Sequence, residues 1–111
     1  MKKETVDFGE IYSKARTRML ETLIGKSLLK KFEKYPDAIK LLAEQQPSPM
    51  SSIRQHKITV EYKVKPESAD SQTFHLEILE TLITQNDQLV QFILSGKNKE
   101  TGRVYETVKK A

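Results

Sequence analysis

Residues 57–65 alternate between apolar and polar side chains, and this alternation is the strongest structural signal in the chain. The apolar residues fall on one face of such a segment: Ile58, Val60, Tyr62 and Val64. Successive side chains of a β-strand point to opposite faces of a sheet, so the pattern predicts a strand with one buried face and one solvated face.

The residues before this strand have a different period. From Phe8 to Leu23 apolar residues recur at spacings of three and four, as on one face of an amphipathic helix. Asp7 followed by Glu10 resembles a capping box at its start. Together with Gly25, Pro36 and the Pro47-Ser48-Pro49 stop, the spacing predicts three helices. These helices cover 6–24, 26–35 and 37–46.

The residues after 57–65 predict three more strands, with turns between them. The second strand begins near Thr73, the third covers 88–95, and the fourth carries Val104 and Val108. A chain of 111 residues suits a single domain, here 1–111, with 1–46 helical and 57–109 forming the sheet. The predicted fold class is α+β, with N-terminal helices packed on a curled four-stranded antiparallel β-meander.

Residues 74–95 also fit a helical spacing, and Gly96 would cap such a helix. Asn86-Asp87 would sit badly in its middle, and Thr73, Phe74 and Ile83 suit strands better. Two strands joined by an Asn86-Asp87 turn are therefore preferred, and the helix remains the alternative.

The Asn86-Asp87 turn places Ile83 opposite Val90, which puts odd-numbered residues of the second strand on its inner face. Phe74, Leu76 and Ile78 are even-numbered. A β-bulge near Leu79-Glu80 reconciles the two sets, and would bend the sheet.

With that bulge, an apolar patch is left on the opposite face of the sheet. Its residues are Leu82, Leu89 and Ile93. An exposed apolar patch of this kind usually marks a contact with a protein partner or a second subunit. We therefore expect these three residues to bind a partner.

Residues 74–79 and 86–96 resemble the strand-turn-strand-Gly segment of the nuclear transport factor 2-like (NTF2-like) superfamily, whose curled sheet around a helix is shared with the cystatins. The resemblance covers about residues 57–109, and residues 1–56 depart from the family pattern. It implies a cystatin-like or NTF2-like fold that is often dimeric through the sheet face. Members include isomerases, cyclases, transport adaptors and assembly factors, so the function does not follow from the fold. The segment 88–92 lacks the glycine of the cystatin inhibitory loop, and protease inhibition is not expected.

Signatures of catalysis and of cofactor or metal binding are absent from the sequence. It has no Cys, no Gly-rich phosphate loop and no nucleophile elbow. His56 and His75 lie on different predicted elements, and His75 shares a solvated strand face with Glu77 and approaches Lys63 or Lys65. We expect no catalytic residue, no cofactor and no metal site. A small isomerase-like or cyclase-like enzyme with a cavity at Tyr62 is one alternative.

A basic stripe supports another alternative. Lys26, Lys30 and Lys34 recur every four residues in a chain of net charge +4, and a basic helix face can follow nucleic-acid phosphates. Glu21 and Glu33 interleave with the stripe, which favours a solvated, salt-bridged face.

The preferred function is a non-catalytic protein-interaction or assembly module, which self-associates or docks a partner through the outer sheet face. No apolar run is long enough to cross a membrane, and none follows the lysines after Met1. A small basic cytoplasmic protein without membrane contact is expected.

Overall fold

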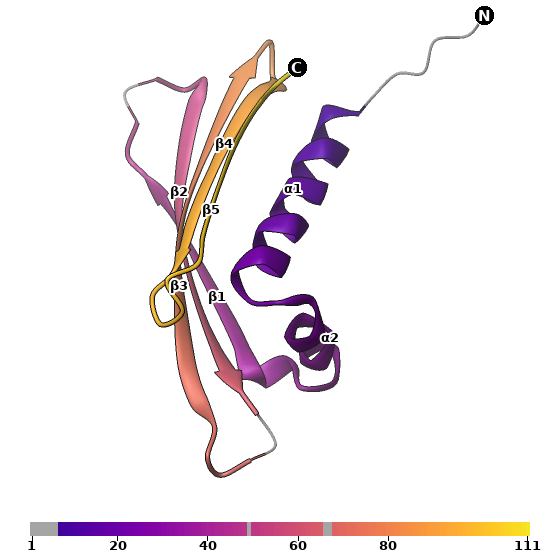
Figure 1. Cartoon of the computed structure of the whole chain (residues 1–111). Coiled ribbons are helices and arrows are strands. Elements are labelled where there is room, and N and C mark those ends of the chain that lie inside the picture. The colour runs from indigo at the N-terminus through magenta and orange to yellow at the C-terminus, as the bar shows by residue number, and fades with distance from the viewer. Residues whose placement is uncertain (1–6, 49, 66–67) are drawn as a thin grey trace, which may run out of the picture.

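The computed structural model describes residues 7–48, 50–65 and 68–111, and shows two α-helices on one face of an antiparallel sheet (Figure 1). The helices are α1 (Phe8–Leu23) and α2 (Lys26–Lys34), followed by a 3-10 helix, η1 (Pro36–Ala38). The strands are β1 (Ile39–Gln46), β2 (Ile53–Val64), β3 (Gln72–Gln85), β4 (Gln88–Asn98) and β5 (Val104–Lys110). The fold is α+β as predicted, but the sheet has five strands rather than four, in chain order.

The additional strand replaces the predicted third helix. Residues 37–46 form the end of η1 and then β1, which pairs antiparallel with β2 from Ile39 opposite Tyr62 to Gln46 opposite Gln55. A short apolar segment fits both the helical and the strand period. Residues 39–46 become a strand because they pair with the edge of β2 that β3 leaves open, and this pairing satisfies backbone groups of both segments.

Residues 74–95 form two strands, so the helical alternative is wrong. The two turn residues between β3 and β4, Asn86 and Asp87, have φ angles of 53° and 61°. Two central residues with positive φ are typical of the tight turn that matches the twist of a hairpin.

The register of this hairpin differs from the prediction. Ile83 lies opposite Gln91, and Leu82 lies opposite Phe92. The register shifts between Ile83 and Thr84, beside the turn, and no shift occurs at Leu79-Glu80. Because the extra residue lies in β4 next to the turn, even-numbered residues of β3 keep to one face as far as Leu82.

The core lies between the helices and the inner face of the sheet. Asp7 caps α1 by accepting a hydrogen bond from the Gly9 amide at 3.0 Å. Most of the buried hydrophobic residues come from the two α-helices and the three central strands: Met19, Leu23, Phe32, Ile58, Val60, Tyr62, Leu76, Ile78, Phe92 and Leu94. Gly96 lets α1 approach closely, since a Cβ there would lie 2.8 Å from Leu23 Cδ1.

Candidate functional site

No described helix covers the second face of the sheet, which we call the outer face (Figure 1). Strand pairing places side chains on it in rows that cross the strands. One row from β2 to β5 contains Lys57, Leu79, Ser95 and Glu106, and the next contains Thr59, Glu77, Lys97 and Val104. The outer face is thus neither wholly apolar nor wholly charged.

Apolar side chains are nevertheless exposed on this face. Leu79 is 44% exposed, Val104 67% and Val108 51%. Beside them lies an open depression of about 610 Å³, whose lining includes Leu79 and Val104. Its charged lining residues are Lys57, Glu77, Lys97 and Glu106. The depression therefore combines an apolar surface with charges of both signs.

The structure separates the three residues predicted to bind a partner. Ile93 lies on the outer face, between Thr81 and Val108 in neighbouring strands, and is half-buried. Leu82 and Leu89 instead pack against the core. Their predicted position on the outer face was therefore wrong: the bulge lies beside the turn and leaves Leu82 on the inner face with Phe92.

We call the group formed by Leu79, Ile93, Val104 and Val108 the outer patch. All four lie at positions whose side chains face away from the helices. The sequence contained a signal for Leu79, since it is odd-numbered in a strand whose inner residues Leu76 and Ile78 are even-numbered. The bulge predicted near Leu79-Glu80 placed Leu79 on the inner face, so this alternation was not followed as far as Leu79.

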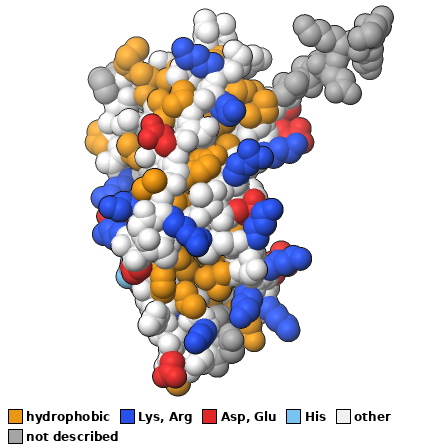
Figure 2. Space-filling model, in the orientation of Figure 1, with side chains coloured by type: hydrophobic (Ala, Val, Ile, Leu, Met, Phe, Trp, Pro, Cys, Tyr) orange, Lys and Arg blue, Asp and Glu red, His pale blue; other side chains and the backbone are white. Residues whose placement is uncertain are grey.

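The three lysines of the alternative nucleic-acid site are exposed on α2. A depression of about 420 Å³ between α1 and α2 is lined by Lys26 and Lys30, and also by Glu21 and Glu33. Figure 2 shows basic and acidic side chains intermixed on the helical side of the molecule. The geometry thus places carboxylates within the basic stripe.

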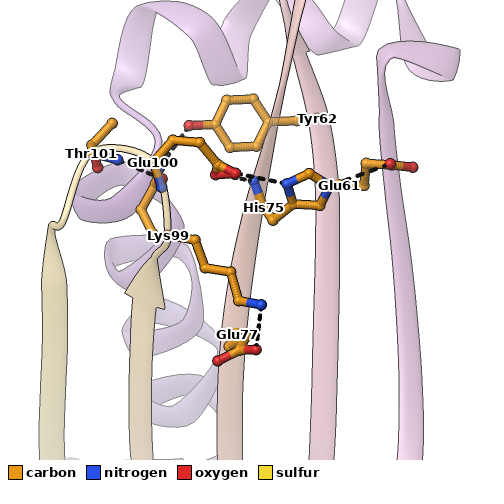
Figure 3. Close-up of polar contacts among 8 residues, drawn as sticks. Glu61, Tyr62, His75, Glu77, Lys99, Glu100 and Thr101 are labelled. Carbon is orange, nitrogen blue, oxygen red and sulfur yellow. Dashed lines mark hydrogen bonds and ion pairs between the residues drawn. The ribbon is translucent and has the colours of Figure 1, made fainter.

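His75 lies between two carboxylates at the end of the sheet (Figure 3). Its Nδ1 is 2.7 Å from Glu100 Oε1, and its backbone amide donates to Glu100 Oε2 at 3.0 Å. Its Nε2 is 3.6 Å from Glu61 Oε1. Hydrogen bonding to His75 lowers the pKa of Glu100. Glu100 thus ties the β4–β5 turn to β3, and Glu61, rather than Lys63 or Lys65, lies opposite His75.

A buried carboxylate forms a second polar cluster. Glu80 is 4% exposed and accepts a hydrogen bond from the Tyr12 hydroxyl. Arg16 Nε lies 3.5 Å from the same carboxylate, and His56 Nδ1 lies 3.3 Å from its other oxygen. The His56 contact lacks hydrogen-bond geometry, since Nδ1 has no hydrogen-bond partner among the described residues. Burial and the Glu80 contact raise the pKa of Tyr12.

Sequence reasoning missed this cluster, although Glu80 has the same parity as Leu76 and Ile78. A buried carboxylate is expensive without partners, and Tyr12 and Arg16 supply them from α1. The cluster therefore fixes the helix on the sheet.

Tyr62 belongs to the core. Its ring is 2% exposed and packs against Phe32 and Phe74 at centroid distances of 5.9 and 5.4 Å. Its hydroxyl accepts a hydrogen bond from Asn98 Nδ2 at 2.7 Å. The ring is thus surrounded by packed side chains, whereas the enzyme alternative requires a cavity there.

Within the described residues, no three His, Asp or Glu side chains are placed to hold a metal ion. None of the described helices combines the length and the apolar character needed to cross a membrane. No family model, curated protein or solved structure matches the chain.

Proposed function

We propose that the chain is a non-catalytic interaction module that self-associates through the outer face of its sheet. The observation that carries this proposal is a sheet face that no described helix covers, with Leu79, Val104 and Val108 exposed beside an open depression. Exposed apolar groups gathered on one face of a small protein are typical of an interaction surface. The resemblance to the NTF2-like superfamily stays a prediction, and the proposal does not depend on it.

The arrangement of charges favours a second copy as the partner. Glu77 of β3 is directly opposite Lys97 of β4. On the two strands that flank this pair, Lys57 of β2 and Glu106 of β5 lie in one row across the sheet. Consider a two-fold axis that runs along the strands between β3 and β4. It would place Glu77 over Lys97 of the second copy, and Lys57 over Glu106. The outer face is thus complementary in charge to itself, as an isologous interface requires.

The same axis brings apolar groups to the centre of the interface. Leu79 and Ile93 lie on the two strands that flank it, and Val108 lies one strand further out. Stacked sheets are separated by about 10 Å, a gap that side chains of this size fill from both sides. Charged residues around an apolar centre are the usual anatomy of a protein interface.

Mass in solution, measured by size-exclusion chromatography with light scattering over a wide concentration range, tests self-association. The native chain should form a dimer, and Leu79→Lys should shift it to the monomer. Leu42→Lys is the matched control, because Leu42 is 60% exposed on the same face but lies on the far strand β1, outside the proposed overlap. Circular dichroism should show the same fold for all three proteins. A native chain that stays monomeric would overturn self-association.

A charge exchange tests the orientation. Lys57→Glu and Glu106→Lys should each weaken the dimer, and the double variant should recover it. Three strand spacings separate the two residues within one chain, about 14 Å, so the recovery must arise between copies. A double variant as weak as the single ones would contradict the proposed axis.

A further inference from the structure

The outer edge of β5 carries backbone groups that no described strand pairs with. Ala111 N donates to the Val90 carbonyl, and Asn98 N donates to the Arg103 carbonyl. The odd-numbered residues of β5 therefore direct their backbone groups toward β4. Pairing alternates in an antiparallel ladder, so the amides and carbonyls of Val104, Glu106 and Val108 point away from β4. Within the described residues no strand pairs with this edge. The edge can therefore accept a further strand.

A groove runs beside this edge, between α1 and β5. Its volume is about 240 Å³, and half-buried residues of both elements line it: Ile11, Ala15, Tyr105 and Thr107. Its other lining residues are the exposed cations Lys14, Arg18 and Lys109. The carboxylate of Glu10 lies 3.9 Å from Lys14, and both side chains are largely exposed, so this pair is weak.

We infer that the β5 edge and this groove bind an extended acidic peptide by strand addition. Backbone hydrogen bonds to the edge would hold the peptide, and every second side chain would face the groove. Carboxylates at these positions would meet Lys14, Arg18 and Lys109, and charge-assisted hydrogen bonds are the stronger kind. This site lies on the helical side of β5 and does not depend on the outer face.

The charges also argue against a second copy of β5 as the added strand. The groove-facing residues of β5 are Tyr105, Thr107 and Lys109, and none is acidic. Two such strands paired edge to edge would bring Lys109 of the second copy toward the cations of the groove. Like charges in close approach oppose this pairing, which leaves a different, acidic segment as the partner.

The experiment is fluorescence anisotropy with a labelled short peptide in which glutamate alternates with valine, and with a lysine-valine peptide as its control. It is done in the Leu79→Lys background, so that self-association through the outer face does not contribute. The acidic peptide should bind and the basic peptide should not. Arg18→Glu and Lys109→Glu should each weaken binding about tenfold. Lys34→Glu, an exposed α2 residue away from the groove, should leave it unchanged.

A backbone substitution separates strand addition from simple charge attraction. Val108→Pro removes one outward amide and should abolish binding, while Val108→Thr keeps that amide and should bind normally. Circular dichroism should confirm the fold of both variants. The inference is overturned if the acidic peptide fails to bind the Leu79→Lys protein, or if Val108→Pro binds as well as Val108→Thr. Either result leaves the proposed self-association untouched, because that is measured separately.

Discussion

The side-chain amide of Asn98 donates a hydrogen bond to the hydroxyl of Tyr62 at 2.7 Å, and both residues are buried. The same Nδ2 donates to the Leu23 carbonyl at 2.9 Å. Asn98 Oδ1 accepts from the backbone amides of Glu100 and Thr101, both at 3.1 Å. One side chain thus joins the end of β4 to β2, to the C-terminus of α1 and to the turn before β5.

Asn98→Leu should therefore be strongly destabilising. It leaves the Leu23 carbonyl, the Tyr62 hydroxyl and two backbone amides without this partner, and we expect a loss of about 2–4 kcal/mol in the free energy of unfolding. Tyr62→Phe should cost less, about 1 kcal/mol, because Asn98 keeps its bond to Leu23. Urea unfolding measures both, with the exposed Tyr35→Phe as a control near zero. Equal losses for Asn98→Leu and Tyr35→Phe would contradict the assigned role.

Gly96 should not tolerate a side chain. A Cβ at this position would lie 2.8 Å from Leu23 Cδ1 and 3.2 Å from Ile78 Cγ1, between α1 and the sheet. Gly96→Ala should therefore lower the free energy of unfolding by about 1–3 kcal/mol through overpacking. The neighbouring Ser95 is exposed, and Ser95→Ala should change stability little in the same urea assay. A Gly96→Ala protein as stable as Ser95→Ala would show that α1 can move away from β4.

Tyr12 should make the fold sensitive to alkali. Burial, followed by the Glu80 contact, raises its pKa above the ordinary value of 10.0. The folded state keeps the proton where the unfolded chain loses it, so this contribution is complete below the unfolded pKa. It is lost as the pH rises from there toward the folded pKa. Burial also raises the pKa of Tyr62.

Urea unfolding on both sides of pH 10.0 checks this expectation. Tyr12→Phe should be less stable at neutral pH, because Glu80 loses a hydrogen bond, but its stability should fall less steeply in alkali. Tyr35→Phe, at an exposed site, is the control for the substitution itself. Identical alkaline slopes for Tyr12→Phe and the native chain would disprove the contribution of Tyr12.

The pKa of Glu100 should depend on His75. Hydrogen bonding from His75 lowers this pKa below its ordinary value of 4.5, so the contact stabilises the fold above that pH and is lost as the pH falls through the folded pKa. His75→Ala should raise the pKa of Glu100, as measured by NMR titration of the side-chain carboxyl carbons. Glu77 is an internal control, since Lys99, at 2.8 Å, lowers its pKa instead. A Glu100 titration unchanged by His75→Ala would rule out the contact in solution.

Local pattern was sufficient for much of the fold. The alternation around Val60 predicted β2, the three- and four-residue spacing after Phe8 predicted α1, and the Asn86-Asp87 turn was confirmed by its positive φ angles. Residues 39–46 were predicted as helix because their apolar positions fit both periods. A neighbouring strand edge, which no local window contains, made them β1.

The residues of the candidate sites depend on the strand register and on contacts between segments that are far apart in the sequence. The bulge lies beside the turn rather than at the predicted Leu79-Glu80. Leu79, and not Leu82, therefore lies on the outer face. The Glu80 cluster joins α1 to the sheet across 68 residues of chain from Tyr12. Neither relationship has a signature at short spacing.

The sequence by itself determined which segments are amphipathic, with which period, and where the hairpin turns. Those properties follow from the chemistry of neighbouring residues, because the spacing of apolar side chains selects a helix or a strand locally. Only the tertiary structure decided the strand register, the pairing of residues 39–46 with β2 as a strand, and which side chains share the outer face. A one-residue shift in register exchanges the two faces of a strand, and only the packing of the whole sheet against α1 distinguishes them.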